Sequence, residues 1–539
     1  MASDGLPAQS TPEHLDVLIL GGGLSGVGAA CQLRKRCPGK TFAVLEAREA
    51  IGGTWDLFRY PGVRSDSDMY TLGYRFRPWR GARSIADGPS ILEYIRDTAR
   101  DHGIEQKVRL GHRAVRAEWS SADARWTVTV QRGERAERGE TVQITCDFLY
   151  CCTGYYRYDA GHSPAFHGSD RFAGEIVHPQ HWPQDLDCTG KRIIVIGSGA
   201  TAVTLVPALA DGGAGHVTML QRSPSYILSL PGRDPLADVL REKLPAQHAY
   251  AIVRWKNVLL TMLNYQLCRR APRTMRKLLR RLVSRQLPQG YDLDKHFTPR
   301  YGPWDQRLCL VPDGDLFQAL SSGRASIETG EISTFTERGI SLADGTQIDA
   351  DVIVSATGLE MMMLGGVELA VDGREIELGA TVAYKGMMLS GVPNLALTVG
   401  YTNASWTLKA DLVAEYVCRV LNHMDAHGLS VCIPQTPDDN LPTVPIIDLT
   451  SGYVLRSVDA LPKQGAVAPW RLHQNYIRDV LLLRRGPIDD GIEFLTRKRS
   501  VGAVARCHAD REGPDAADAE QLRDGLASAS GAPIEGALR

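Results

Sequence analysis

The chain has 539 residues and a formal net charge of −1 at pH 7, a length that predicts two or three domains. The near-neutral charge argues against bulk electrostatic binding of nucleic acid. Residues 1–16 are polar and poor in basic residues, unlike a signal or transit peptide, and no apolar stretch is long enough to cross a bilayer.

The eleven cysteines are scattered and odd in number, and none forms a C-x-x-C pair. This pattern indicates buried free thiols in a reducing, cytoplasmic compartment rather than disulfides or metal ligands.

A strand, a glycine-rich turn and a helix open the first nucleotide-binding unit. Residues 16–20 predict a short buried strand, residues 21–26 read G-x-G-x-x-G, and residues 27–33 have helical character. In this setting the helix N-terminus faces a pyrophosphate. A second predicted strand, 41–45, ends at Glu46, whose carboxylate would accept hydrogen bonds from an unphosphorylated ribose, as in FAD or NAD. The alternative is an ordinary turn before a helix.

A second unit of the same kind follows later in the chain. Residues 191–196 predict a β-branched strand, and residues 197–202 read G-x-G-x-x-A. The next predicted strand, 216–221, ends at Arg222, and a planar guanidinium there suits a 2′-phosphate. We therefore expect NADPH rather than NADH at this loop. A solvated charge at a strand end is the alternative for Arg222.

Residues 52–66 lack the periodicity of a helix or strand and are rich in glycine, proline and aromatic residues. Long loops of this kind are usually functional or disordered. The aromatic side chains of Trp55, Phe58 and Tyr60 argue against disorder, so we expect a functional loop that favours FAD at the first site.

Several motifs together resemble one enzyme group. Residues 172–183 read F-x-G-x-x-x-H-x-x-x-W-P, the 52–66 loop begins G-G-x-W and reaches an aspartate after Y-P-G, and strand–T-G turns occur at 148–154 and 351–358. These motifs resemble the type I Baeyer–Villiger monooxygenases. The runs at 55–62 and 400–411 resemble more narrowly the ethionamide-activating monooxygenases, and the likeness covers about residues 14–500.

The resemblance implies an α/β fold with two Rossmann-like dinucleotide-binding domains, for FAD and NADP, and a helical insertion in the NADP domain. The tail is rich in Ala, Asp, Glu and Gly, a composition typical of disorder. The expected parts are a flexible N-terminus at 1–13, an FAD domain at 14–155 and 356–500, an NADP domain at 156–229 and 301–355, the insertion at 230–300, and a disordered tail at 501–539.

The resemblance also implies an activity. We expect an FAD-dependent, NADPH-consuming monooxygenase that inserts one atom of O2 into ketones, giving esters or lactones through a peroxide at flavin C4a, and that also oxidises sulfides and thioamides. One alternative is a flavin monooxygenase acting mainly on sulfur or nitrogen, although that group typically lacks the Trp182-Pro183 ending. Others are a flavin or disulfide reductase, which would need a redox-active cysteine pair, and a non-catalytic dinucleotide sensor.

By the same resemblance Arg307 is the catalytic residue that points at the flavin, and Asp66 lies beside it. A fixed cation would stabilise a buried oxygen anion that is otherwise costly. The alternatives are a salt-bridged surface arginine and a loop-capping carboxylate. Gln306 stands where many members have lysine, which leaves more of the phosphate recognition to Arg222. We expect His178 to hold the link between the domains without transferring a proton.

We expect no metal site. The residues expected to bind the cofactors are Gly21, Gly23, Ser25, Gly26, Glu46, Thr54, Trp55, Asp56, Leu57, Arg64, Ser65, Asp66, Gly197, Ser198, Gly199, Ala200, Thr201, Ala202, Val203, Arg222 and Ser223.

The expected insertion is strongly basic. Residues 254–285 contain ten Lys/Arg and no acid, with leucines near helical spacing and Pro272 dividing the stretch. The pattern predicts two or three amphipathic helices. We expect a packed helical subdomain with a solvated basic face, and the alternative is contact with a membrane surface or a lipophilic substrate entrance.

Overall fold

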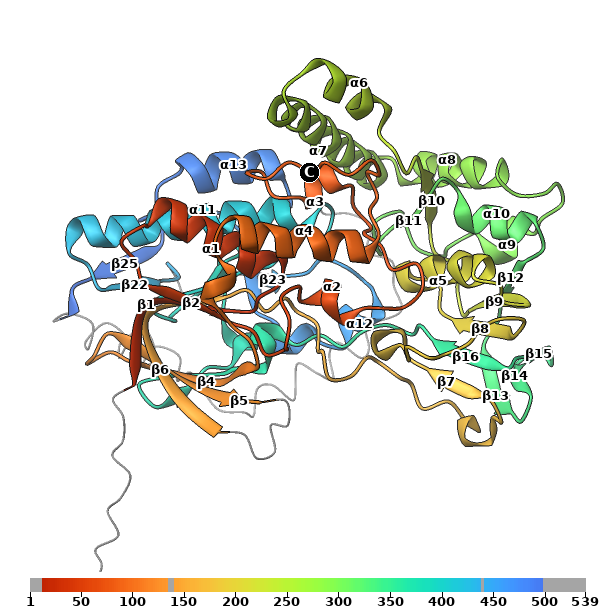
Figure 1. Cartoon of the computed structure of the whole chain (residues 1–539), viewed down its shortest axis with the longest axis horizontal. Helices are drawn as coiled ribbons and strands as arrows, with labels where there is room; N and C mark the ends of the chain where they lie inside the picture. The colour runs from red at the N-terminus through yellow and green to blue at the C-terminus, as the bar shows by residue number, and fades with distance from the viewer. Residues whose placement is uncertain (1–11, 134–139, 438–440, 498–539) are drawn as a thin grey trace, which may run out of the picture.

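The computed structural model describes residues 12–133, 140–437 and 441–497 (Figure 1). The expected disordered tail and nearly all of the expected flexible N-terminus lie outside these ranges. Figure 1 shows one α/β unit on the left and a second on the right, with helices α6 and α7 above them.

The first unit contains a nine-stranded sheet within the described residues, in the order β18-β17-β4-β5-β6-β1-β2-β3 with β21 also paired to β6. Helices α1 (Leu24–Arg36), α4 (Gly88–Asp101) and α11 (Trp406–His427) belong to this unit. The strands are β1 Glu13–Leu20, β2 Phe42–Leu45, β3 Val108–Arg109, β4 His112–Ser120, β5 Arg125–Arg132, β6 Glu140–Cys151, β17 Glu368–Val371, β18 Arg374–Glu375 and β21 Leu395–Leu397. The chain beyond residue 356 therefore returns to the first sheet.

The second unit is a five-stranded parallel sheet in the order β12-β9-β8-β16-β7. Its strands are β7 Glu175–Val177, β8 Arg192–Ile196, β9 His216–Gln221, β12 Ala325–Thr329 and β16 Val352–Ser355, with helices α5 Ala200–Asp211 and α10 Asp315–Ser321. The β-branched run of β8 is buried, as is typical of a central parallel strand. The run at 172–183, in which His178 was expected to hold the link between the domains, also contains an edge strand, β7, that pairs with β16.

The insertion is helical, with α6 Pro235–Lys243, α7 Ala246–Arg270, α8 Pro272–Ser284 and α9 Leu293–His296. Pro272 is the first residue of α8, a position that tolerates proline because its N–H would have no helical partner. Helix α7 docks on the first unit through buried Arg254, which donates to the carbonyls of Tyr70 and Gly73 and pairs with Asp411. None of the described helices is long and apolar enough to span a membrane.

The remaining described α-helices and strands are short. They are α2 Thr54–Leu57, α3 Met69–Leu72, α12 Gly452–Leu455, α13 Tyr476–Arg485, β10 Ile227–Leu230, β11 Cys309–Pro312, β13 Ile332–Thr336, β14 Gly339–Leu342, β15 Gln347–Asp349, β19 Ala383–Tyr384, β20 Met388–Leu389, β22 Val431–Pro434, β23 Thr443–Pro445, β24 Lys463–Gly465 and β25 Ile492–Leu495.

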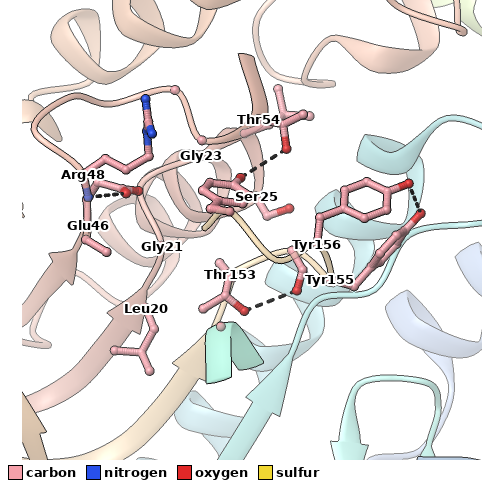
Figure 2. A pocket seen from close by; sticks show the side chains of 18 of the residues that line it. Leu20, Gly21, Gly23, Ser25, Glu46, Arg48, Thr54, Thr153, Tyr155 and Tyr156 are labelled. Carbon is pink, nitrogen blue, oxygen red and sulfur yellow. Dashed lines mark hydrogen bonds between the residues drawn. The ribbon is translucent and has the colours of Figure 1, made fainter. Parts of the chain in front are cut away.

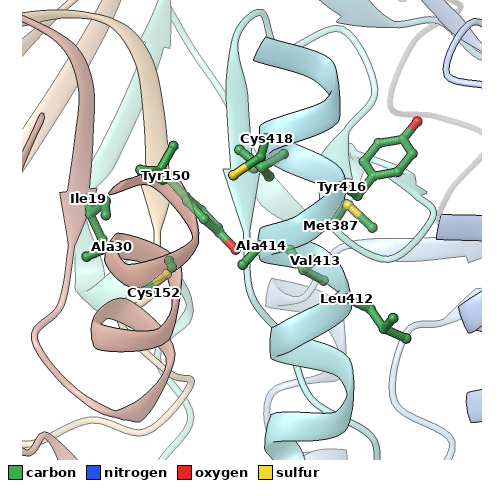
Figure 3. Close-up of a cluster of buried hydrophobic side chains, with 14 of the residues drawn as sticks. Ile19, Ala30, Tyr150, Cys152, Met387, Leu412, Val413, Ala414, Tyr416 and Cys418 are labelled. Carbon is green, nitrogen blue, oxygen red and sulfur yellow. The ribbon is translucent and has the colours of Figure 1, made fainter. Parts of the chain in front are cut away.

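The core of the first unit lies between the sheet and helices α1 and α11 (Figure 3). Tyr150 of β6 and Cys152, directly after that strand, enter this core together with Ala30 of α1 and Ala414 of α11. Small residues where the two helices meet let their backbones approach closely. This packing fixes the carboxyl end of β6 against the first glycine loop.

Candidate active site

A cavity of about 530 Å³ lies at the carboxyl ends of β1, β2 and β6 (Figure 2). Ligands of doubly wound α/β sheets bind at this edge. The residues that line the cavity come from the first glycine loop, the 52–66 loop and the segments 152–159 and 362–367, together with Arg307. The cavity therefore brings together segments that are far apart in the sequence.

The first glycine loop is shaped by close backbone approaches. Gly21 has φ +102°, and a Cβ there would lie 2.7 Å from the carbonyl oxygen of Cys152. A Cβ on Gly26 would lie 1.8 Å from the carbonyl oxygen of Gly21, so the start of α1 can pack on the strand only with glycine there. Gly21, Gly23 and Ser25 line the cavity, beside the N-terminus of α1. Its free N–H groups suit a pyrophosphate.

Glu46 follows β2 and lines the same cavity, although it is only 5% exposed. Its carboxylate accepts hydrogen bonds from the N–H groups of Gly22, at 2.7 Å, and Arg48, at 2.9 Å. Burial raises the pKa of Glu46, and these hydrogen bonds oppose the rise. The carboxylate is thus held in one orientation at the place expected to meet a ribose.

Of the four residues at 54–57 that were expected to bind a cofactor, two line the cavity. Thr54 and Trp55 line the cavity, and the Thr54 hydroxyl lies 3.2 Å from the Tyr158 hydroxyl. Asp56 and Leu57 are not among the lining residues, so the structure does not bring them to the cavity wall. The physical reason is the one-turn helix α2, which turns Asp56 into a buried site where Arg48, Arg59 and Arg96 hold its carboxylate.

Arg64 and Ser65 line the cavity, but their side chains have protein partners. Arg64 forms an ion pair with Asp315 at the start of α10, which ties the 52–66 loop to the second unit. The Ser65 hydroxyl donates to the carbonyl of Ser67 at 2.6 Å. These contacts fix the loop on either side of Asp66.

Arg307 and Asp66 face each other in the cavity wall, with Nε of Arg307 3.6 Å from Oδ2 of Asp66. About a third of each side chain is exposed, 35% for Arg307 and 33% for Asp66. Burial is the largest single influence on Arg307 and lowers its pKa, but the charge of Asp66 acts together with Tyr155, Tyr156 and Tyr453 to leave the pKa above its usual value. Arg307 is therefore a permanent cation in the cavity wall.

The second glycine loop has the same backbone requirement as the first. Gly197 has φ +140°, and a Cβ there would lie 2.4 Å from the carbonyl oxygen of Ala356. The Ser198 hydroxyl donates to the carbonyl of Ser223 at 3.1 Å. Gly199, Ala200, Thr201, Ala202 and Val203 continue into α5, and Arg222 is exposed directly after β9. None of these residues is in the wall of the large cavity.

His178 lies on the chain that links the two glycine loops. Its Nε2 is 3.3 Å from the carbonyl oxygen of Gly358, and its Nδ1 accepts from the N–H of Gln180 at 3.2 Å. Gln180 in turn donates to the carbonyls of Arg157 and Tyr158. Burial lowers the pKa of His178, which keeps the imidazole neutral at neutral pH. These contacts are those of a structural link.

Nine of the ten described cysteines are buried, and all ten are free. Cys146 and Cys151 have a C-x4-C spacing, a pattern also found in redox pairs, but neither is among the cavity-lining residues. Cys152 lines the cavity, and burial raises its pKa to about 12, so it is a neutral thiol at physiological pH. Among the described residues no three His, Cys, Asp or Glu side chains are grouped so as to hold a metal ion.

Comparison with known families shows to which protein family the chain belongs. The family model for flavin-binding monooxygenase-like proteins matches residues 86–364, more than half of the chain, and the model for an NAD(P)-binding Rossmann-like domain matches residues 19–81. The chain belongs to the flavin-binding monooxygenase-like family.

Two relatives show how much of this flavin-binding monooxygenase-like chain is shared. The FAD-containing monooxygenase EthA of Mycobacterium tuberculosis is 57% identical over 91% of this chain and 99% of its own length. The putative FAD-containing monooxygenase MymA of the same organism is 54% identical over 89% and 97%. A solved structure of oxidized steroid monooxygenase bound to NADP superposes with a TM-score of 0.71, at 24% identity over 89% of this chain and 99% of that one.

Sequence patterns did not identify the aromatic part of this monooxygenase-like cavity. Tyr155, Tyr156 and Trp406 line it together, with ring centroids 4.5 Å apart for the two tyrosines and 5.0 Å for Tyr155 and Trp406. Nε1 of Trp406 donates to the Ser25 hydroxyl at 2.7 Å, which ties α11 to the glycine loop. Two sequence features could have indicated these residues. The tyrosines directly follow the T-G turn, and Trp406 lies within the 400–411 run.

Proposed function

We propose that this protein is an FAD-dependent, NADPH-consuming monooxygenase that inserts one atom of O2 into ketones to give esters or lactones, and that also oxygenates sulfides and thioamides. The observation that carries the proposal is Arg307, a permanent cation paired with Asp66 in the wall of the cavity that contains the first glycine loop. The names of the relatives, FAD-containing monooxygenases, and the NADP of the steroid monooxygenase structure support the choice of cofactors.

The residues present fit FAD at the cavity. Glu46 is a fixed, buried acceptor for ribose hydroxyls, and Gly21 and Gly23 leave the N-terminus of α1 open to the pyrophosphate. Thr54, Trp55 and the aromatic wall would then surround the ring system. Asp56 would act indirectly, by holding Arg48 and Arg96 around the loop.

The second loop fits NADPH. Gly197 and Gly199 would receive the pyrophosphate at the start of α5, and Arg222 would pair with the 2′-phosphate. Because Gln306 is neutral, Arg222 would supply much of the discrimination against NADH.

When bound, FAD reduced by NADPH activates O2 and supplies the oxygen atom, which is chemistry that no side chain of the protein provides. Attack on a ketone places negative charge first on the reacting oxygen and then on the former carbonyl oxygen. Arg307 would stabilise that charge electrostatically in a cavity with apolar walls. Asp66 would act as a positioning residue that keeps the guanidinium turned to the cavity.

Exclusion of water is the other task of the cavity wall, because water would divert the activated oxygen into hydrogen peroxide. The rings of Trp55, Tyr155, Tyr156 and Trp406 supply an apolar lining for this purpose. Transfer of oxygen to sulfur does not require a stabilised anion, so it would depend less on Arg307 than attack on a ketone does.

The test is to give the FAD-loaded enzyme NADPH and O2 with a cyclic ketone and, separately, an aryl sulfide. The proposal predicts lactone from the ketone, detected by mass spectrometry, together with sulfoxide from the sulfide. Sulfoxide alone would assign the protein to the monooxygenases of sulfur or nitrogen. Failure of NADPH to bleach the bound flavin without oxygen would contradict the enzyme assignment altogether.

A further inference from the structure

The exposed apolar side chains of the protein are concentrated on the helical insertion. Among the described residues, ten of the eighteen large hydrophobic side chains that are exposed lie between Leu236 and Leu278. Soluble surfaces rarely gather such side chains into one patch, and a patch of this kind rimmed by charge marks an interaction site. Six of them, which we name the α7 stripe, are Ile252, Trp255, Leu259, Leu260, Leu263 and Leu267.

The α7 stripe follows one side of a helix whose other side is fixed. Its members are 43–56% exposed and recur mostly three or four residues apart, as on a single helix face. The opposite side of α7 is buried through Val253, Arg254, Val258 and Cys268. The stripe is therefore displayed on a rigid element.

Helix α13 extends the same surface. The rings of Trp255 and Tyr476 are 5.6 Å apart, which places the start of α13 beside α7. Ile477 and Leu481 of α13 are 38% and 55% exposed. Figure 1 shows α13, α7 and α8 along one edge of the molecule, the upper edge in that view.

Positive charge gathers where the α7 stripe ends. Four of the ten basic residues between 254 and 285 form ion pairs with carboxylates of other segments: Arg254, Lys256, Arg269 and Arg280. Five others are exposed and have no carboxylate partner within the described ranges: Arg270, Arg273, Lys277, Arg281 and Arg285. In a chain whose net charge is −1, this is a local excess of cations.

The corner between α7 and α8 also contains a recess of about 480 Å³. Arg269, Arg273 and Arg276 line it together with Asp305. The size and the guanidinium groups suit a phosphate-bearing headgroup. The segment with Trp304 and Asp305 adjoins this recess and leads to Arg307. Helix α7 contacts the segment twice: the ring centroid of Tyr265 is 5.7 Å from that of Trp304, and Arg269 forms an ion pair with Asp305.

We propose that the α7 stripe and the basic corner, which consists of Arg270, Arg273, Lys277, Arg281 and Arg285, form a docking surface for a membrane that contains anionic phospholipids. The leucines enter the interface, and the arginines and lysine contact lipid phosphates, as in amphipathic helices that lie on bilayers. A second copy of this chain fits less well, because a two-fold interface would set the same unpaired cations against each other. The charges alone would suit a nucleic acid, but the exposed leucine stripe would not.

The test is flotation of the FAD-loaded full-length protein with vesicles of phosphatidylcholine, with and without phosphatidylglycerol. We expect the anionic vesicles to be bound at least about tenfold more tightly, with the preference reduced by salt. Equal binding to both vesicle types, or no binding to either, would overturn the proposal.

Two sets of variants separate the apolar and the charged parts. Each set should weaken binding to anionic vesicles by about tenfold or more, because each removes one of the two contributions. The apolar set is Leu259→Ser, Leu263→Ser and Leu267→Ser, and the charged set is Arg270→Gln, Arg273→Gln and Lys277→Gln. The matched controls elsewhere on the surface are Leu110→Ser, Val444→Ser and Val467→Ser, and Lys35→Gln, Arg100→Gln and Arg338→Gln.

Because every substituted side chain is exposed, each variant should fold. Its thermal unfolding and flavin content, which check this, should match those of the unaltered protein. The controls should bind vesicles like the unaltered protein. If the apolar set binds anionic vesicles normally, the proposal fails. If that set instead converts a dimer to a monomer in ultracentrifugation and the unaltered protein binds no vesicles, the surface belongs to a second copy of the chain.

Discussion

The two nucleotide-binding units are built on one plan and differ where they would meet the ribose. Strands β3-β2-β1-β6 in the first sheet and β12-β9-β8-β16 in the second have the same order. In each unit the first glycine has a positive φ and lies against a carbonyl just ahead of a T-G turn, Gly21 against Cys152 and Gly197 against Ala356. The shared plan therefore extends to individual backbone contacts.

The difference lies at the end of the second strand of each unit. Glu46 is buried, held by two backbone N–H groups and part of a cavity wall, whereas Arg222 is exposed and outside that wall. From this contrast we infer that the first unit holds its cofactor as a resident group, while the second receives a cofactor that exchanges. One backbone plan thus serves two modes of binding because the surrounding segments enclose only one of the loops.

The largest expected effect comes from adding a methyl group to each first glycine. Gly21→Ala forces a Cβ to within 2.7 Å of a backbone oxygen in a conformation that side chains rarely adopt, at a cost of about 1–3 kcal/mol for the backbone alone. We expect this variant to be purified without flavin. Gly197→Ala should retain flavin and its yellow absorbance but lose reduction by NADPH. Loss of flavin from both variants would break the comparison.

An intermediate effect is expected at the strand ends. Arg222→Gln should raise the KM for NADPH about tenfold to hundredfold, the usual range for losing a hydrogen bond to a charged group, and leave the KM for NADH nearly unchanged. Glu46→Gln should weaken FAD retention and leave the ratio of the two KM values as it was. Steady-state kinetics with both nucleotides measures this, and an unchanged NADPH preference in Arg222→Gln would remove Arg222 from phosphate recognition.

A smaller effect, on the pH dependence of stability, is expected at His178 in the segment that links the two units. The pKa of His178 is depressed below its usual 6.5 in the folded chain, chiefly by burial. Below pH 6.5 the unfolded chain binds the proton more readily, so this contribution to stability is present above that pH and is lost as the pH falls. Between pH 8 and pH 5.5, the melting temperature of His178→Gln should therefore fall by less than that of the unaltered protein. The melting temperature of His248→Gln, changed at an exposed site, should fall by as much as that of the unaltered protein. Parallel losses in all three would contradict the neutral structural role.

The smallest effect is expected at Cys152. Because burial raises its pKa to about 12, the thiol is neutral and a poor nucleophile. Cys152→Ser should keep flavin reduction by NADPH and product yield within about twofold. A complete loss of turnover with flavin still bound would instead indicate thiol chemistry beside the cavity.

The sequence predicted the parts of the fold that depend on local patterns. The strands before and after each glycine loop were predicted within one residue, apart from the start of β1 at Glu13, because buried strands, glycine turns and strand-end charges are close together in the chain. The helical nature of the insertion, with its break at Pro272, followed from leucine spacing and proline chemistry. These features need no knowledge of distant contacts.

The parts that local patterns could not predict depend on contacts between distant segments. Asp56 was expected to bind a cofactor, and no local pattern indicated that Arg48, Arg59 and Arg96 would surround its buried carboxylate. The strand β7 forms only because β16, far along the chain, provides an edge to pair with. The proximity of Arg307 and Asp66 was expected from family resemblance, because no spacing or periodicity connects them.

The most direct measurement compares Arg307→Ala with the unaltered enzyme in two assays on the same preparation, with Arg338→Ala as a control at an exposed site. Anaerobic bleaching of the flavin by NADPH should continue in Arg307→Ala, since the hydride transfer does not use the guanidinium. Lactone formation from a cyclic ketone should fall by about a hundredfold to a thousandfold, the usual effect of removing a group that stabilises an oxyanion. Lactone yield equal to that of the unaltered enzyme would contradict the role of Arg307.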